Sequence, residues 1–211
     1  MEQEEIDPVE KYLLLILYAK GPNKTICEPI RGDLWAQKEM FLISRNVPSA
    51  EKEFEAYLLG PFSELVDEYI SQLKVSEYIK KDSEGVRLTE KGRTIASEIW
   101  EKETDETKLM IEDVKSFLND MTRDELLVFI YSTFEEFAEE SEVKEEIERK
   151  RLDVSISLFK KHKISLKRAA AVAQLPINEY VTLLKSRGIP IYEYTDEELR
   201  EELLAGRAHS S

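Results

Sequence analysis

Six side chains between residues 167 and 187 are of the types that contact nucleic acids. Asn178 and Thr182 are four residues apart, so one face of a helix would present both of them to the edges of bases. The other four are cations that can bind backbone phosphates: Lys167, Arg168, Lys185 and Arg187. We therefore interpret this stretch as a candidate DNA-binding site.

The charge of the chain is distributed unevenly along the sequence. The whole chain carries a net charge of -14, which argues against a general nucleic-acid binder. Residues 149–191, however, contain ten basic and two acidic side chains, whereas residues 103–148 contain four basic and sixteen acidic ones. A basic segment in an acidic protein is typical of a local nucleic-acid site. The alternative is that the basic segment only neutralises the acidic helices before it.

Two short helices joined by a tight turn are predicted between Lys163 and Tyr192. Ser165 is a good N-cap for the first helix, because its hydroxyl can accept from amides of the first turn. Pro176 suits the start of the second helix, and Gly188 followed by Pro190 suits its end. Helix, turn and helix in this order would place a recognition helix in the major groove of DNA.

The same stretch contains the pattern basic-I-S-L-x-x-A-A-x-x-A, a turn, an aromatic residue, and L-L-x-x-x-G-I-P. The residues that carry it are Ser165, Leu166, Ala169, Ala170, Ala173, Tyr180, Leu183, Leu184, Gly188, Ile189 and Pro190. In this pattern the chain resembles the UPF0175 family of small prokaryotic proteins. The resemblance implies a helix-turn-helix regulator of antitoxin type, followed by an acidic segment that would engage a toxin protein. The chain departs from the family at Gln174 and Leu175, which occupy a turn where glycine or another small residue is usual.

Residues 1–102 predict a winged helix, that is, helices followed by a small β-hairpin and a closing helix. The hairpin consists of a strand at Glu77–Lys80, a turn at Asp82–Gly85 and a strand at Val86–Leu88, and Thr89 caps the closing helix. The helices before the hairpin are predicted at Val9–Ala19, Asp33–Ser44 and Phe62–Leu73.

The segments Q-K-x-x-F-L, Y-x-L-G-P-F-S and L-T-x-K-G resemble archaeal winged-helix proteins and, more distantly, the Panacea domain of prokaryotic antitoxins. They are carried by Gln37, Lys38, Phe41, Leu42, Tyr57, Gly60, Pro61, Phe62, Ser63, Leu88, Thr89, Lys91 and Gly92. The helix that would enter a DNA groove carries Glu64, Asp67 and Glu68 but no cation, so we do not expect it to read DNA. For this domain we favour protein–protein contact or dimerisation.

The chain is therefore predicted to be mainly α and to have three parts. Residues 1–102 would form the winged-helix domain, residues 103–150 an acidic helical connector, and residues 151–204 the helix-turn-helix domain. Apolar stripes in the connector, from Ile111 to Phe137, are wide for an isolated pair of helices, so we expect a homodimer.

No catalytic constellation is visible in the sequence. There are two histidines, and the single cysteine, Cys27, has no neighbour in the sequence that would activate it. No P-loop or metal-binding motif occurs. We therefore expect neither enzymatic activity nor a cofactor nor a metal ion. The single cysteine and the lack of any apolar run near ~20 residues suggest a cytoplasmic protein without a membrane span.

Two hypotheses from different classes remain open. The leading one is a cytoplasmic transcriptional regulator of antitoxin type that binds double-stranded DNA as a homodimer, with a toxin protein as a further partner. The alternative is a protein–protein interaction module that does not bind DNA.

Overall fold

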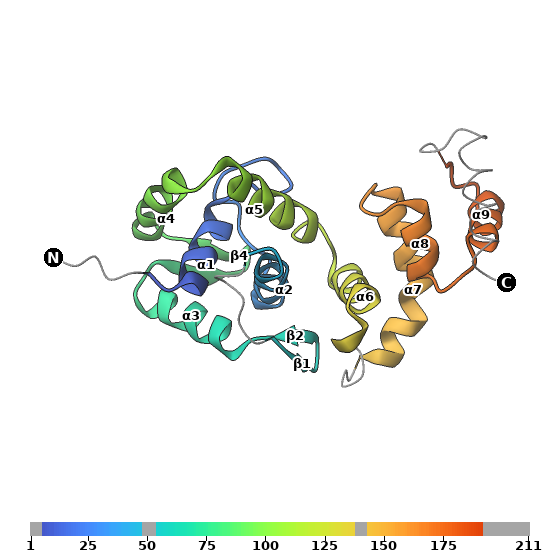
Figure 1. Cartoon of the computed structure of the whole chain (residues 1–211), viewed down its shortest axis with the longest axis horizontal. Coiled ribbons are helices and arrows are strands. Elements are labelled where there is room, and N and C mark those ends of the chain that lie inside the picture. Colours follow the sequence, from blue (N-terminus) through green and yellow to red (C-terminus); the bar gives the residue numbers. More distant parts are fainter. Residues whose placement is uncertain (1–5, 48–53, 138–142, 192–211) are drawn as a thin grey trace. The chain divides into compact units, whose positions relative to one another are not determined.

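Helices dominate the computed structural model, which describes residues 6–47, 54–137 and 143–191 (Figure 1). This confirms the prediction of a mainly α chain. The contacts divide the chain into two compact units. The first unit consists of Met1–Thr122 and Phe134–Glu142, and the second consists of Arg123–Thr133 and Val143–Ser211.

The first unit is built around one helix that is apolar on nearly all sides. Helix α1 (Pro8–Tyr18) buries seven of its residues, as expected of a central helix. It packs against four further helices and a strand: α2 (Asp33–Ser44), α3 (Glu64–Val75), α4 (Glu90–Lys102), α5 (Asp105–Leu118) and β4 (Gly85–Leu88). Helix α5, which begins the predicted connector, thus belongs to the core of the first unit.

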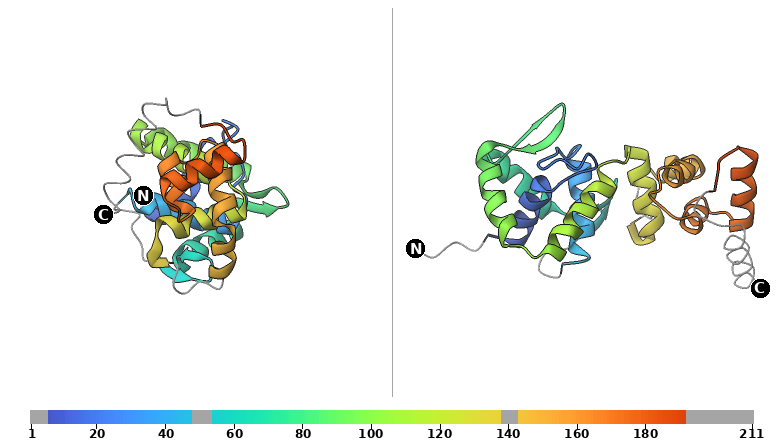
Figure 2. Two further views of the ribbon diagram at one scale, coloured as in Figure 1. Left: turned by 90° about the vertical axis from the view of Figure 1, so that its right-hand side faces the viewer. Right: turned by 90° about the horizontal axis from the view of Figure 1, so that it is seen from above.

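The predicted hairpin is present as β3 (Ile79–Asp82) and β4, with the turn at Asp82–Gly85 as expected. It projects from the helices of the first unit (Figure 2). The first strand begins two residues later than predicted, because Glu77 adopts a left-handed conformation that ends α3. The amide of Tyr78 then donates to the Leu73 carbonyl at 2.9 Å, which closes the helix.

A second, shorter hairpin was not predicted. It pairs β1 (Glu55–Tyr57) with β2 (Gly60–Phe62), and each strand has only three residues. Pro61 lies within β2, and proline is unusual in strands because it lacks an N–H group. The sequence predicted only a helix from Phe62 onward in this region, whereas α3 begins at Glu64.

Buried side chains of α2 explain why the Q-K and G-P-F-S segments occur together. The Gln37 amide accepts from the Ser63 N–H at 3.1 Å and donates to the Ser63 carbonyl at 3.0 Å. Lys38 Nζ donates to the Pro61 carbonyl at 2.8 Å. The two segments therefore fix α2 to β2 and the start of α3. Burial lowers the pKa of Lys38 to about 7, so a large fraction of this amine is neutral at physiological pH.

Two further charged residues are fully buried in the first unit. Lys115 of α5 donates to the carbonyls of Leu17 and Ala19 at 3.2 and 2.8 Å, where α1 ends. Burial lowers the pKa of Lys115 to about 8, although Glu39 acts in the opposite direction. The Glu39 oxygens accept no hydrogen bond from the described part of the chain. Burial raises the pKa of Glu39 well above its usual value, so a neutral carboxyl group is favoured there.

The chain returns to the first unit after a helix of the second. Phe134 precedes the 3-10 helix η2 (Glu135–Phe137), and Phe137 is its last residue. Both side chains pack against Phe41 of α2. Their ring centroids lie 4.8 and 5.2 Å from that of Phe41, and the rings meet edge to face.

The second unit contains four described helices: α6 (Arg123–Thr133), α7 (Lys144–Lys160), α8 (Leu166–Val172) and α9 (Ile177–Ser186). Helix α7 packs against α6 and α8, and α8 also contacts α6 and α9. The buried Tyr180 hydroxyl lies 3.1 Å from the Ser155 hydroxyl, which joins α9 to α7. The acidic segment predicted to follow, residues 192–211, lies outside the described residues.

Lys38 should make the stability of the first unit depend on pH. Between about pH 7 and 10 the unfolded chain keeps this proton while the folded chain loses it, so the amine favours folding more as the pH rises. The free energy of unfolding of wild type, measured relative to that of Lys38→Met, should therefore rise by up to about 1.4 kcal/mol per pH unit in this range. Urea unfolding followed by the fluorescence of Trp35 and Trp100 measures it.

The exposed Lys102 provides the matched control for this experiment. Lys102→Met should leave the pH dependence of wild type unchanged. A difference between wild type and Lys38→Met that stays constant from pH 7 to 10 would contradict the prediction.

Candidate nucleic-acid interface

Left-handed residues close α8 and α9. At the end of α8, Gln174 has a φ of 55°, and its amide donates to the Ala171 carbonyl at 3.0 Å. The next amide, of Leu175, donates to the Ala170 carbonyl at 3.0 Å. This is a Schellman motif, which usually employs glycine because other residues are strained in the left-handed region. Gln174 thus takes the conformation that glycine would take, which accounts for the departure from the family pattern.

The end of α9 repeats this geometry with the predicted glycine. Gly188 has a φ of 66° and donates to the Lys185 carbonyl at 3.0 Å, while Ile189 donates to the Leu184 carbonyl at 2.9 Å. At the start of α8, the Ser165 hydroxyl accepts from the Arg168 amide at 3.2 Å, which confirms the predicted cap. Pro176 directly precedes α9 as its N-cap.

Burial of one face of each helix determines which residues remain exposed. On α8, the buried residues include Leu166, Ala169 and Ala170. On α9, the buried residues are Tyr180, Val181 and Leu184. The opposite faces therefore carry the polar residues of both helices into solvent.

The outer face of α9 presents the two predicted base-reading residues. Asn178 and Thr182 are both exposed and line an open hollow of about 460 Å³ together with Glu179, Leu183 and Ser186. The Thr182 hydroxyl donates to the Asn178 carbonyl at 2.8 Å, so its lone pairs remain available to a ligand. The sequence analysis had not included Glu179 in the site, although its position beside Asn178 on a helix could have suggested it.

The four predicted cations do not have equivalent surroundings. Arg168 is half-buried and donates to the Ser132 carbonyl at 2.9 Å and to the Thr133 hydroxyl at 2.7 Å. It therefore closes the C-terminal end of α6, where carbonyl groups need donors. Lys167 and Lys185 are exposed and have no ion pair within 4.0 Å in the described segments.

Several cations of the basic segment neutralise acidic side chains within the second unit. Lys150 Nζ lies 2.8 Å from Asp124 and 2.6 Å from Glu146, and the pKa of Lys150 is raised by these hydrogen bonds. Lys161 Nζ lies 2.8 Å from the buried carboxylate of Glu125. Two more pairs are the exposed Arg187 with Asp153 and the partly buried Arg151 with Glu148. Part of the positive charge therefore serves the fold.

Other types of site find no support in the described ranges. Within residues 6–47, 54–137 and 143–191, no group of three or more His, Cys, Asp or Glu side chains is placed to hold a metal ion. No helix in these ranges combines the length and apolarity needed to cross a membrane. Burial raises the pKa of the Cys27 thiol, which disfavours the reactive thiolate.

The structure thus defines a mainly helical protein whose second unit contains, among its described residues, two capped helices that are joined by a tight turn and polar on their outer face. The chain belongs to the UPF0175 family, which is described as an uncharacterised protein family. The family profile matches residues 133–208. A UPF0175 protein of Aeropyrum pernix is 41% identical over 59 residues, which are 28% of this chain and 75% of the relative. No solved structure matches the chain.

The two left-handed caps should respond oppositely to substitution. Gln174→Gly should stabilise the second unit by about 0.5–1 kcal/mol, because glycine removes the strain at this turn. Gly188→Ala should destabilise it by about 1 kcal/mol through strain alone, since an added Cβ would meet no atom within 4 Å. Hydrogen exchange of the amides of α8 and α9 measures both effects. Loss of protection in Gln174→Gly would contradict this account of the turn.

The neighbours Lys167 and Arg168 should differ strongly in their effect on stability. Arg168→Ala removes the donor to the Ser132 carbonyl and should destabilise the second unit by about 1–2 kcal/mol. Lys167→Ala, one residue away, should stay within about 0.5 kcal/mol of wild type. Thermal unfolding by circular dichroism compares them, and equal stabilities of the two variants would exclude a capping role for Arg168.

Proposed function

We propose that the protein is a non-enzymatic DNA-binding regulator, in which α8 and α9 act as a helix-turn-helix and α9 enters the major groove. The observation that carries the proposal is the outer face of α9. Asn178, Thr182 and Lys185 follow one another at steps of four and three residues, so they share this face. Tyr180 and Leu184 hold the opposite face in the core of the unit.

Each exposed residue has a distinct task in this proposal. The Asn178 amide suits the paired donor and acceptor of adenine, and Thr182 can contact either kind of base edge. Glu179 opens into the same hollow and can accept from the amino group of cytosine. Lys167 and Lys185, which have no ion pair in the described segments, bind phosphates. Arg168 supports α8 through its hydrogen bonds to the end of α6, and its remaining donors can contact a phosphate.

The wider role that we propose is that of an antitoxin-type regulator in the cytoplasm. The support is the family relation together with the helix-turn-helix pattern described above. A homodimer would place two copies of α9 in successive major grooves, which compensates for the few phosphate contacts that one copy offers. The acidic segment after residue 191 would engage a toxin protein.

The competing candidate is a protein–protein interaction module that does not bind DNA. Two observations favour it. The whole chain is acidic, with a net charge of -14, so duplex DNA is repelled at long range. In addition, Lys150, Lys161 and Arg187 are already paired with carboxylates of the same unit.

Filter binding to genomic fragments, including the promoter of the protein's own gene, distinguishes the two candidates. Asn178→Ala should cost about 1–3 kcal/mol on the retained fragment and little on random duplex, because base contacts carry the specificity. Lys185→Ala should weaken binding to all fragments and lower the slope of log K against log salt by roughly 0.9.

Ser186→Ala serves as the control for these variants, because it lies in the same hollow and removes only a hydroxyl group. Its hydroxyl already donates to the Leu183 carbonyl at 2.8 Å, so little change in affinity is expected. If folded wild-type protein retained no fragment even at low salt, the regulator would be excluded and the interaction module would remain.

A further inference from the structure

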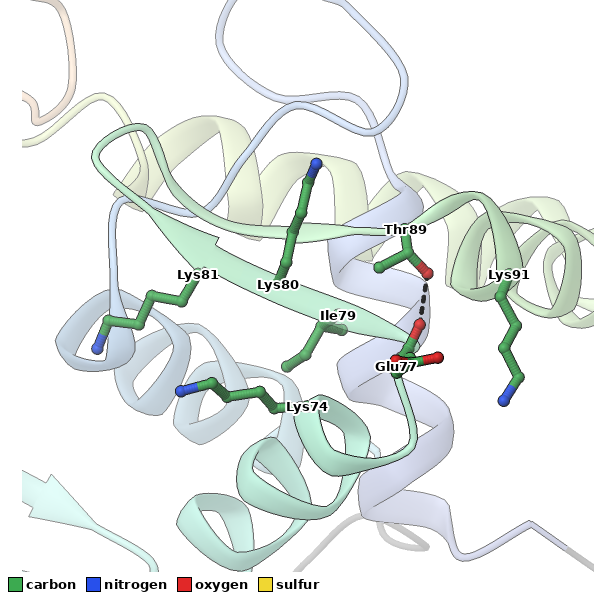
Figure 3. A pocket seen from close by; sticks show the side chains of 7 residues that line it. All are labelled: Lys74, Glu77, Ile79, Lys80, Lys81, Thr89 and Lys91. Carbon is green, nitrogen blue, oxygen red and sulfur yellow. Dashed lines mark hydrogen bonds between the residues drawn. The ribbon is translucent and has the colours of Figure 1, made fainter.

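A second basic surface lies on the first unit, along the β3–β4 hairpin. Four lysines surround an open hollow of about 470 Å³ there: Lys74 at the end of α3, Lys80 and Lys81 on β3, and Lys91 in the first turn of α4. Glu77, Ile79 and Thr89 complete its lining (Figure 3). We call this set of seven residues the hairpin surface.

The ammonium groups of the hairpin surface are only partly engaged. Lys81 pairs with Asp33 at 2.5 Å, and Lys91 donates to the Ser76 carbonyl at 2.9 Å and lies over the Tyr78 ring. Lys74 and Lys80, by contrast, have no ion pair within 4.0 Å among the residues that the structure describes.

Nearby carboxylates compensate only part of this positive charge. Asp82 and Glu84, at the tip of the hairpin, are both paired with Arg87. Glu77 is therefore the one carboxylate that lines the hollow, against four lysines. The hairpin surface is a local positive patch on an acidic chain.

The geometry favours an extended polyanion over a small anion. In Figure 3, Lys74 and Lys81 extend to one side of β3, Lys80 extends to the other side, and Lys91 lies beyond Glu77. The ammonium groups are thus spread out and do not converge on one point. The Thr89 hydroxyl is used internally, because it donates to the Glu77 carbonyl at 2.6 Å. Dispersed point charges match the repeated phosphates of a nucleic-acid backbone.

The composition of the lining also argues against a protein partner. Protein interfaces have an apolar centre, but the only apolar side chain that lines the hairpin surface is Ile79, which is 4% exposed. Val75 is exposed beside Lys74, yet it does not line the hollow.

Protection of a sheet edge would explain only part of this arrangement. Lysines on an edge strand discourage pairing with other chains, which could account for Lys80 and Lys81. Lys74 and Lys91, however, come from helices. Lys91 lies in the first turn of α4, where a cation is unfavourable because it faces the positive end of the helix dipole. A residue that breaks a local rule in this way often serves a function.

We propose that the hairpin surface is a second nucleic-acid-binding site, which contacts backbone phosphates through Lys74 and Lys80, with Lys91 beside them. Helix α3 contributes only Lys74 at its C-terminal end, since its preceding turns expose Glu64, Asp67 and Glu68. The sequence suggested protein–protein contact or dimerisation for this unit, and we propose nucleic-acid binding instead. The inference concerns residues of the first unit only, so it does not require that α9 bind DNA.

Three double variants of the full chain test the hairpin surface, and each lowers the net charge by two. The hairpin variant is Lys74→Gln with Lys80→Gln, the helix variant is Lys167→Gln with Lys185→Gln, and the control is Lys102→Gln with Lys108→Gln. The probe is fluorescently labelled duplex DNA of random sequence, and its anisotropy gives the affinity as a function of salt. The hairpin variant should bind on the order of 10-fold more weakly than the control, with a salt slope lower by about 1.8.

The pattern of results separates this inference from the proposed function. A lower salt slope in the hairpin variant alone supports the hairpin surface as a binding site and counts against DNA binding by α8 and α9. A lower salt slope in the helix variant alone overturns the inference and leaves the proposed function standing. A lower slope in both variants supports both sites. If neither variant differs from the control, or wild type does not bind the duplex, both ideas are overturned.

Two further measurements address a protein partner for the hairpin surface. Poly-glutamate should compete much less well than unlabelled duplex at equal charge concentration, and Val75→Ser should not change DNA binding. Equal competition by poly-glutamate that is lost in the hairpin variant would overturn the nucleic-acid assignment in favour of an acidic polypeptide.

Discussion

Each helix leaves carbonyl groups without partners at its C-terminal end, and much of this structure depends on how they are satisfied. Long cations do so in three places: Lys115 at the end of α1, Lys91 at the end of α3 and Arg168 at the end of α6. Left-handed residues also do so, at Glu77, His162, Gln174 and Gly188. Since the chain has only seven glycines, most of these left-handed positions carry a side chain. Ending the helices thus uses cations that could otherwise bind a ligand, and it places residues with side chains in a strained backbone conformation.

This use of cations limits what a count of charges reveals about binding. Arg168 was predicted to bind phosphate, and in the structure its guanidinium also donates to the Ser132 carbonyl at the end of α6. Lys38 and Lys115 count as surface charge but are buried in the first unit. The cations left for a polyanion are those without a partner in the described segments, such as Lys74 and Lys80 on one unit and Lys167 and Lys185 on the other. Because they are few, only a few counterions would be released on binding, so the slope of affinity against salt would be shallow.

Local signals in the sequence predicted the local structure well. The caps at Ser165 and Thr89 and the turn at Asp82–Gly85 each depend on a few neighbouring residues, and all are present. The exposure of Asn178 and Thr182 likewise followed from helical periodicity. Contacts between distant residues could not be predicted. Lys115 and Ala19 are 96 positions apart, and Arg168 and Ser132 are 36 apart, so no local pattern indicates them. The lysines of the hairpin surface come from two helices and a strand, so no local pattern indicated the hollow that they share.

The order in which the chain visits its two units has a consequence for how the protein can be divided. The chain passes from the first unit to the second after Thr122, returns at Phe134 and leaves again at Val143. A single proteolytic cut therefore cannot release the second unit intact, because α6 is connected to the first unit on both sides. A fragment from Val143 onward would lack α6, exposing the apolar residues of α7 and removing the acceptor of Arg168. The family match begins only at residue 133, so it leaves out nearly all of α6. The segment that matches the family and the second structural unit therefore do not consist of the same residues.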